Sequence, residues 1–408
     1  MTKLRRTLPL PLVVLYGLGV TIGAGIYVLL GATAARAGVH APLSFVLASI
    51  VMAFSATSYA ELSTRYPVSA GEAAYVRVGL KSSALATIVG FMVILSGIVS
   101  SATIILGSTG YIHEFIDLPT WTLIVGLVVL LGGVAAWGIL ESVLLASLFT
   151  LFEVGALLYI IFAGVLDNPS IAADIPQIIP EWRDGAAWGA ISSAGLLAFF
   201  AFIGFEDIVN LAEEAKEPET LMPRAIFWTL GLGTLLYFSL TAVAVLSVPL
   251  PELAQSKAPL SFVFETITGA SPVVITMIAI VATLNGVIIQ IIMASRVLYG
   301  MANQGNVPAV LGSVNRVTRT PLLATAAVSL LVLVLALTIP IENLAEWTSR
   351  IVLLVFTLVN ASLVLIKLRN EPAPAVCFRT WIGVPILGVI MSLALLVAPL
   401  ISAFLFTN

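Results

Sequence analysis

Charged residues and cysteine are both scarce in this sequence of 408 residues. Only 10% of the residues are Asp, Glu, Lys or Arg, whereas a soluble domain usually carries about 25%. A surface that faces water cannot be built from so few charges, so a soluble globular protein is excluded. Because Cys377 is the single cysteine, no disulfide bond can form within the chain.

Histidine is almost as scarce, and its two positions argue against a metal site. His40 and His113 lie far apart in the sequence and near expected helix ends. With one cysteine they do not provide the ligand spacing of a metal site. We therefore expect solvated loop histidines, no bound metal and no cofactor.

Long apolar runs are what the sequence has in abundance. Hydrophobic residues make up 60% of the chain, and the mean hydropathy is +1.12. A helix that crosses a bilayer needs about 20 predominantly apolar residues. On that rule the sequence predicts an all-α polytopic membrane protein of about 11 transmembrane helices, at 9–36, 41–65, 83–110, 121–140, 142–166, 188–211, 224–249, 272–302, 321–339, 345–368 and 380–406. The intermediate stretch 253–269 is too short to span and is expected to lie on the bundle.

The first apolar run has the charge pattern of a secretory signal peptide but not its length. Lys3, Arg5 and Arg6 precede the run. The run itself, 8–30, is longer than the roughly 7–15 residues of a signal-peptide core. We therefore expect a retained first transmembrane helix.

The positions of Lys and Arg predict the orientation. If the N-terminus is cytoplasmic, most of the 18 Lys and Arg residues lie on the cytoplasmic side, as the positive-inside rule requires. Those that fall on or near the outer side are Arg36, Arg183, Lys257 and Arg350. We expect a multi-pass protein of the cell membrane with an extracytoplasmic C-terminus. No charged or Ser-rich linker divides the chain, so a single transmembrane domain is predicted over 1–408.

Two predicted spans contain residues that disfavour a regular helix. The first span has four glycines between Gly17 and Gly25, and each Gly costs about 1 kcal/mol relative to Ala in a helix interior. The sixth span has Gly204 followed by Glu206 and Asp207. A charged group at membrane depth costs at least about 2.5 kcal/mol. We expect both helices to be unwound at these positions.

Unwinding would free backbone N–H and C=O groups, which membranes tolerate only where they line a cavity. Freed N–H groups suit a carboxylate and freed carbonyls suit an ammonium group. The breaks lie five spans apart, as expected for inverted repeats at 1–166 and 188–368, with 380–406 as an extra helix. An alternative for Gly19 and Gly23 is close helix packing, since they form a GxxxG pattern.

Four motifs in this order resemble the amino acid–polyamine–organocation (APC) superfamily of permeases. They lie at 22–26, 59–72, 200–225 and 295–308. The resemblance covers nearly the whole chain and implies a LeuT-type fold, a five-plus-five inverted repeat with broken helices 1 and 6. It also implies a secondary active transporter of amino acids or closely related small amines, and not an enzyme. The family usually has twelve spans, whereas eleven are predicted here.

The resemblance implies a substrate site formed by the two predicted breaks. Backbone N–H groups of the first break would hold the substrate carboxylate, and carbonyls of both breaks would hold its amino group. Phe200 or Phe202 would close an outer gate, and Thr21 would add a hydroxyl contact. The candidate substrate-binding residues are Thr21, Ile22, Gly23, Ala24, Gly25, Ile26, Phe200, Ala201, Phe202 and Ile203.

Glu153 is an acid within the apolar core of the predicted fifth span. An ionisable residue inside the membrane is a functional candidate by default. Many sodium-independent members of the superfamily carry Lys at the corresponding position, so this chain has the opposite charge there. We predict that Glu153 gains and loses a proton, or binds a cation, next to the first helix, with H⁺ favoured over Na⁺. The alternative is a protonated Glu that only hydrogen-bonds a neighbouring helix.

Three further polar residues are candidates for a gate or a cavity: Glu206, Asn285 and Arg296. Each has a structural alternative. Glu206 could cap the inner half-helix, Asn285 could pack between helices, and Arg296 could extend to the membrane interface. Glu72 and Arg77 are expected in a solvated cytoplasmic loop.

The sequence therefore predicts transport of a small-molecule amino acid or amine by alternating access. We expect the lipid bilayer as surroundings, no nucleic-acid partner and no obligate protein partner. Two alternatives stay open: an uncoupled exchanger, and a nutrient sensor with a transporter fold that binds without transport. A membrane enzyme is disfavoured because no His cluster, metal spacing or Ser–His pair lies at membrane depth.

Overall fold

The computed structural model describes residues 8–67, 71–137, 143–212, 215–303, 305–315, 318 and 320–406. Eleven long helices in these residues lie at the eleven predicted spans, and the sixth span is formed by the eighth helix together with the short helix that follows it. They are α1 (Leu10–Ala37), α2 (Ala41–Arg65), α4 (Ser83–Ile112), α5 (Thr120–Trp137), α6 (Val143–Asp167), α8 (Gly185–Phe200), α9 (Pro218–Ser247), α12 (Val273–Asn303), α13 (Leu322–Thr338), α14 (Ile341–Leu368) and α15 (Gly383–Phe406).

Shorter helices connect the long ones. They are η1 (Gly38–His40), α3 (Gly71–Leu80), α7 (Ile171–Asp174), η2 (Ile175–Ile178), η3 (Phe205–Leu211), α10 (Leu250–Gln255), α11 (Pro259–Thr268) and η4 (Ala309–Gly312). The stretch that was expected to lie on the bundle forms α10 and α11. The chain is a polytopic helical membrane protein: eight segments in the described ranges are long and apolar enough to cross a bilayer, and three shorter apolar helices accompany them.

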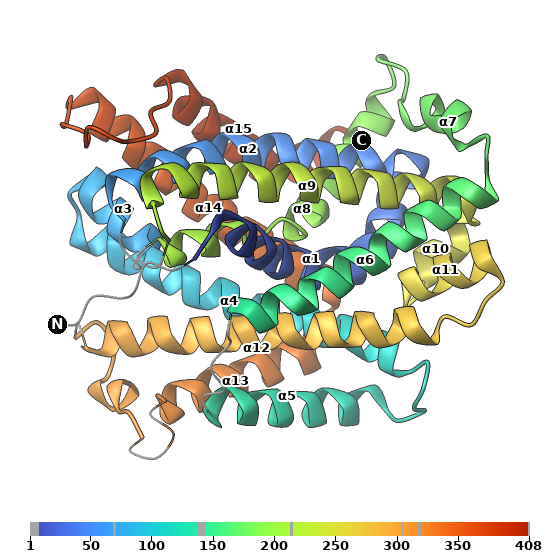
Figure 1. Cartoon of the computed structure of the whole chain (residues 1–408), viewed down its shortest axis with the longest axis horizontal. Helices are drawn as coiled ribbons and strands as arrows, with labels where there is room; N and C mark the ends of the chain where they lie inside the picture. The colour runs from blue at the N-terminus through green and yellow to red at the C-terminus, as the bar shows by residue number, and fades with distance from the viewer. Residues whose placement is uncertain are drawn as a thin grey trace.

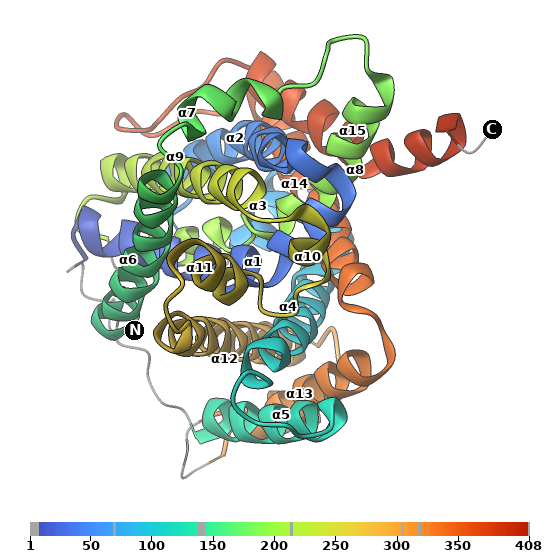
Figure 2. The same ribbon diagram turned by 90° about the vertical axis from the view of Figure 1, so that its right-hand side faces the viewer.

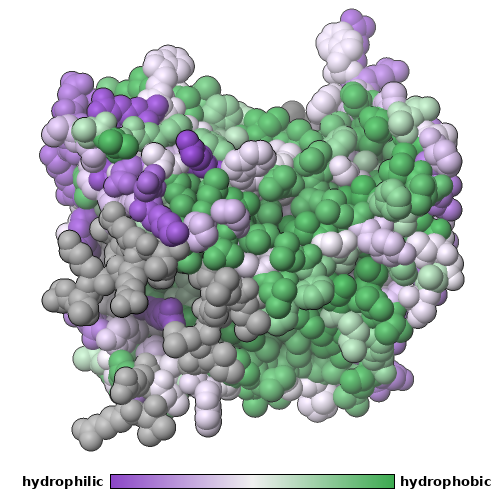
Figure 3. All heavy atoms as spheres, in the orientation of Figure 1, coloured by the Kyte–Doolittle hydropathy of each residue, from purple (hydrophilic) through white to green (hydrophobic). Residues whose placement is uncertain are grey.

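The long helices pack side by side around α1 (Figures 1 and 2). Helix α1 contacts α6, α8, α9 and α12, while α5 and α13 pack together at one edge and α15 packs against α14 at another. The two ends of the bundle differ. One end, called here the α3 face, carries α3 and the segment between α14 and α15; the other, the α7 face, carries α7, α10 and α11 (Figure 1). Between the faces the surface is mainly apolar (Figure 3).

Local sequence explains where several helices begin and end. The side chain of Ser82 accepts a hydrogen bond from the N–H of Leu85 at the start of α4, 3.2 Å away. Asp184 does the same for the N–H of Ala187 at the start of α8, at 2.9 Å. Such caps satisfy N–H groups that have no partner within the helix. At the other end of α11, Gly269 adopts the left-handed conformation that stops the helix.

The predicted interruption of the sixth span is present. Helix α8 ends at Phe200, a turn occupies 201–204, and η3 continues the span. Gly204 has a φ of 113°, a conformation that residues with a Cβ rarely adopt. The ring of Phe205 packs edge-on against Tyr59 and Phe356, with centroids 5.6 Å from each. Aromatic contacts from α2 and α14 thus fix the position of the break.

The predicted interruption of the first span is absent, and this expectation was wrong. Helix α1 is continuous from Leu10 to Ala37. Its glycines have a packing role instead. A Cβ on Gly25 would overlap the backbone of Ala201, and one on Gly23 would lie 3.0 Å from the carbonyl oxygen of Ala282. The glycines let α1 approach its neighbours closely, which is the alternative that their spacing offered.

Candidate functional site

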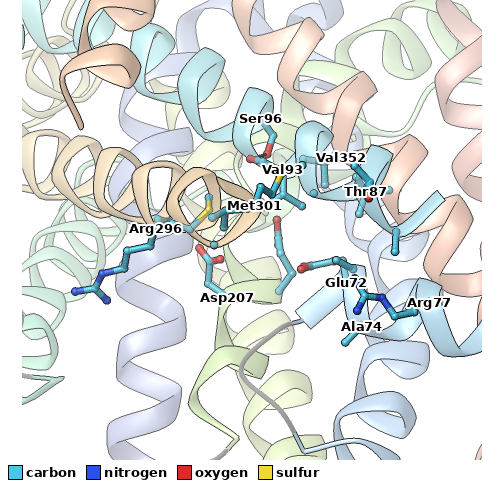
Figure 4. Close-up of a pocket in the computed structure, with 18 of the residues that line it drawn as sticks. Glu72, Ala74, Arg77, Thr87, Val93, Ser96, Asp207, Arg296, Met301 and Val352 are labelled. Carbon is cyan, nitrogen blue, oxygen red and sulfur yellow. Dashed lines mark hydrogen bonds between the residues drawn. The ribbon is translucent and has the colours of Figure 1, made fainter. Parts of the chain in front are cut away.

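A cavity of about 470 Å³ lies in the half of the bundle next to the α3 face. Its walls come from α3, α4, η3, α12 and α14. The exposed side chains of Arg77 and Arg296 are among its lining, so the cavity reaches the surface at this face. Figure 4 shows the acidic side chains of Glu72 and Asp207 on two sides of the same space, with Arg296 pointing away from both.

Three carboxylates line this cavity: Glu72 from α3, and Glu206 and Asp207 from η3. Gln290 of α12 also lines it and is 6% exposed. No hydrogen bond to the Gln290 amide occurs within the described part of the chain, so its polar group can bind a ligand. The cavity therefore combines three acidic side chains with an amide that can donate or accept a hydrogen bond.

Glu72 differs from the expected solvated loop residue, because it is only 9% exposed. Its Oε1 accepts a hydrogen bond from the Tyr59 hydroxyl at 3.3 Å. Burial raises the pKa of the Glu72 carboxyl group above its ordinary value. The sequence contained a pattern that indicates burial of Glu72. Tyr75, Val76 and Gly79 follow at helical spacing and are buried with Glu72 on one face of α3.

Glu206 lies at the start of η3 and lines the cavity. Its Oε2 accepts a hydrogen bond from the Gly204 N–H at 2.9 Å, at the N-terminal end of η3. A carboxylate at this position stabilises the start of the helix. The same side chain lines the cavity. The hydrogen bond from Gly204 therefore holds an acidic side chain at the cavity wall.

The candidate substrate-binding residues of α1 and of the α8–η3 break lie next to one another. Gly25 packs directly against Ala201. The Ala201 carbonyl accepts a hydrogen bond from the Tyr237 hydroxyl at 2.9 Å, and the Thr21 hydroxyl donates to the Gly17 carbonyl. These groups already have partners within the protein.

Among these candidates Ile203 lines the cavity. The others pack above it, towards the α7 face. Ile22, Ile26, Phe200 and Phe202 are at most 1% exposed. The Phe202 ring packs edge-on against Tyr237, with centroids 5.0 Å apart. The side chain of Ala24 lies outside the described part of the chain. The cavity thus ends at Ile203, which directly follows Phe202 and lies three residues after Phe200.

Glu153 of α6 points at α1. The residue is 2% exposed, and its Oε2 has no hydrogen-bond partner in the described part of the chain. A Cβ added to Gly23 would lie 3.9 Å from this oxygen. The backbone carbonyl of Glu153 accepts a hydrogen bond from the Tyr27 hydroxyl of α1 at 3.4 Å. The carboxyl group is therefore buried, unpaired and directed at the glycine-rich segment of α1.

The two remaining candidates are both on α12 but differ in position. Arg296 lines the cavity and is exposed at its mouth. Asn285 is half-buried and is not among the lining residues; Gln290 is the α12 amide that is. Helix α12 is apolar on most of its circumference, so its sequence pattern does not distinguish the side that faces the cavity.

On the α7 face α1 and α14 are tied together. Arg36 near the end of α1 forms an ion pair with Glu346 of α14 at 2.6 Å, and Arg350 also contacts Glu346 at 2.9 Å. The cavity therefore reaches one face while an ion pair bridges the helices at the other. Within the described residues no group of His, Cys, Asp and Glu could hold a metal ion.

Comparison with known proteins connects this arrangement to a family. Residues 12–407 match the model of a family described as amino acid permease. The chain is 27% identical to the branched-chain amino acid permease BcaP of Bacillus subtilis, over 88% of this chain and 80% of the permease. It is 31% identical to the vacuolar cationic amino acid transporter 2 of Arabidopsis thaliana, over 91% of this chain and 62% of that protein. It is 27% identical to human cationic amino acid transporter 4, over 92% of this chain and 62% of that one.

Proposed function

The chain belongs to the amino acid permease family, and on this basis we propose that it is a secondary active transporter of amino acids or closely related small amines. It crosses the membrane eleven times, with 1–166 and 188–368 as inverted repeats and 380–406 as an additional helix. The N-terminus and the α3 face are cytoplasmic. The protein works by alternating access, and protons drive uptake.

The observation that supports proton coupling is the unpaired carboxyl group of Glu153. A buried acid without a hydrogen-bond partner or counter-ion is stable only when protonated or when a cation reaches it. Its Oε2 lies against Gly23 of α1, a helix that contacts both α8 and α9. Gain or loss of one proton at Glu153 therefore changes how tightly α6 holds α1.

The transport cycle follows from the difference between the two faces. The described structure has a cavity that reaches the α3 face, and the ion pair between Arg36 and Glu346 joins α1 to α14 at the α7 face. In this state, substrate taken up from outside is released to the cytoplasm through this cavity. The cavity ends at Ile203, where the candidate residues of α1 and of the α8–η3 break form the end of the binding site. Movement of α1 and α8 relative to α14 opens the Arg36–Glu346 contact and closes the cavity.

The carboxylates of the cavity favour a substrate with a second positive charge. Glu72, Glu206 and Asp207 face the same space. A cation that enters this space favours the ionised form of the buried acids and is then attracted to it. The names of the Arabidopsis and human relatives point to the same class of substrate, whereas that of BcaP points to branched-chain amino acids. We propose cationic amino acids as the first substrates to test.

The test is uptake of radiolabelled lysine, arginine and leucine by proteoliposomes under an imposed pH gradient. We expect wild type to accumulate one of the cationic amino acids. Glu153→Gln should lose accumulation driven by the gradient and keep exchange of internal for external substrate. Glu265→Gln is the matched control, because Glu265 is an exposed acid on α11 and should leave both activities unchanged.

Four outcomes would contradict parts of this proposal. If Glu153→Gln accumulates substrate as fully as wild type, this acid does not couple transport to protons. Exchange without accumulation by wild type, under proton and sodium gradients alike, identifies an uncoupled exchanger. Binding of an amino acid with no movement across the membrane identifies a nutrient sensor. Preference for leucine over both cations refutes the role of the three carboxylates in substrate choice.

A further inference from the structure

A second hollow, of about 500 Å³, lies at the α3 face and is separate from the transport cavity. It is formed by the end of α2 and by the segment that joins α14 to α15. Three basic side chains line it, from Arg65, Lys367 and Arg379, together with one acid, Glu371. None of these residues lines the cavity described above.

Cations outnumber carboxylates around this hollow. Glu61 is fully buried, and it pairs with both Arg65 at 2.8 Å and Lys367 at 2.7 Å. Glu371 likewise serves two cations, Arg369 at 2.8 Å and Lys81 at 3.9 Å. Each carboxylate thus neutralises one of its two partners, and positive charge is left over at both. A further anion would be attracted to this region.

Arg379 adds a cation that has no acidic partner. Its side chain is exposed, and no Asp or Glu of the described residues forms an ion pair with it. One Arg379 nitrogen lies 3.5 Å from the Pro374 carbonyl oxygen, which is a long contact. The remaining guanidinium donors are available, and their planar arrangement suits two oxygens of a phosphate group.

The wall of the hollow is held in place by contacts within the protein. Lys367 donates to the Thr380 carbonyl at 2.7 Å, and the Thr380 N–H donates to Glu61 at 2.8 Å. Asn370 has a φ of 51°, and the Glu371 N–H bonds back to the Ile366 carbonyl at 3.2 Å. The segment after α14 therefore turns sharply and is anchored to α2. A ligand would meet a preformed site, which lowers the entropic cost of binding.

Exposed apolar side chains lie at the end of α14 and on the same segment that forms the hollow. Trp381 is 74% exposed, Leu368 is 62% exposed and Val376 is 60% exposed. They lie where α14 leaves the apolar belt and α15 enters it. Tryptophan is enriched at the interface between lipid chains and headgroups. The basic hollow is therefore next to a surface that suits lipid.

From this combination of charge and position we propose that the hollow binds the phosphate headgroup of an anionic phospholipid. Arg379 holds the phosphate, and the unneutralised charge of the Glu61 and Glu371 clusters attracts it. Basic pockets between transmembrane helices are known to bind such headgroups. Because the hollow joins α2 to the α14–α15 segment, a bound lipid links the two. Free phosphate shares the chemistry, and the experiment separates the two sources.

The test is native mass spectrometry of the purified full chain in detergent. Phosphatidylglycerol or phosphatidylcholine is added in equal amount, with and without inorganic phosphate. We expect wild type to retain phosphatidylglycerol in preference to phosphatidylcholine. Arg379→Gln should weaken that retention roughly fivefold, the factor that one cation contributes near an anionic membrane surface. Arg183→Gln is the matched control, because Arg183 is an exposed arginine of the α7 face, stacked on Trp182 at 4.5 Å.

The remaining outcomes overturn the proposal at different points. Equal retention of phosphatidylglycerol by wild type and Arg379→Gln refutes the site. Equal loss in Arg183→Gln and Arg379→Gln shows general attraction to charge and also refutes it. Displacement of phosphatidylglycerol by inorganic phosphate at equal concentration, with no lipid preference, identifies a free phosphate site instead of a lipid site. The proposed transport activity does not depend on any of these results.

Discussion

At the scale of single residues, the environment of Glu72 predicts a pH dependence. The carboxyl group is almost completely buried and accepts a hydrogen bond from the Tyr59 hydroxyl. Burial raises its pKa above 4.5, the value expected for the unfolded chain. The folded protein then binds the proton more tightly than the unfolded chain does. Stability is therefore greatest below about pH 4.5 with respect to this group, and it decreases as the pH rises towards the pKa in the folded state.

The substitution Glu72→Gln should remove this loss of stability at higher pH. The amide keeps an oxygen that can accept from Tyr59, and it cannot ionise. We expect the melting temperature of the variant to rise relative to wild type as the pH increases above about 4.5. Thermal unfolding of detergent-purified protein between pH 4 and pH 8 measures the difference. Glu114→Gln, at an exposed acid beyond the end of α4, is the control. A difference that stays constant with pH would show that Glu72 does not titrate in this range.

The candidate site shows which of its residues could be predicted from the sequence alone. Glu153 could be identified because an acid in an apolar span is rare and costly. Glu72 was missed because a charged residue between two spans is usually in water, and only the packing of α3 against α4 and α14 buries it. Gln290 and Asn285 are both amides on α12. Which of them faces the cavity depends on the rotation of α12, and an almost wholly apolar helix does not reveal it.

At the scale of helices, the glycines of α1 have a measurable packing role. Gly25 faces the backbone of Ala201, where a Cβ would overlap main-chain atoms that cannot move independently. Ala is a better helix former than Gly by about 1 kcal/mol. Overpacking typically costs about 1–3 kcal/mol, and a clash with backbone belongs at the upper end of that range.

We therefore expect Gly25→Ala to destabilise the protein by about 1–2 kcal/mol, the difference between these two effects. Thermal unfolding in detergent measures this change. Gly231→Ala on α9 is the matched control, because a Cβ there meets no atom within 4 Å, and it should be neutral or slightly stabilising. If Gly25→Ala were as stable as that control, α1 and the α8–η3 break would not be in close contact.

The same helices show which parts of the fold the sequence could predict. The positions of the eleven long helices follow from apolar runs, since length and polarity determine them directly. The break at Gly204 was predictable because two acids and a glycine follow one another in an apolar span. In α1 the glycines have no neighbouring charge. A glycine in a helix is compatible with unwinding and with close packing alike. Only the residues that pack against each glycine distinguish the two.

At the scale of the whole molecule, the proposed orientation can be tested through the single cysteine. Cys377 lies in the segment between α14 and α15, on the α3 face. Replacing it by Ser gives a background without cysteine. In that background Ala375→Cys, an exposed position on the same segment, should react with a membrane-impermeant maleimide only after cells are permeabilised. Ser170→Cys, exposed next to α7, should react in intact cells.

The opposite labelling pattern would invert the proposed topology. It would place the cavity of the described structure on the outside. The excess of Lys and Arg at the α3 face would then contradict the positive-inside rule. Labelling of both positions in intact cells would show that one of the intervening helices does not cross the membrane.

The hydrogen bond from Tyr237 to the Ala201 carbonyl has a further consequence for the rate of turnover. In the proposed site, an ammonium group that reaches this carbonyl shares it with the hydroxyl or replaces it, so the protein carries its own competitor for that position. A hydrogen bond between neutral groups contributes only about 1 kcal/mol net, and exchanging one for another gains less than forming a new one. The site would bind its substrate weakly at this carbonyl, and the Tyr237 hydroxyl would form its hydrogen bond again as the substrate leaves. A carrier that must release what it binds many times a second gains speed from such an arrangement.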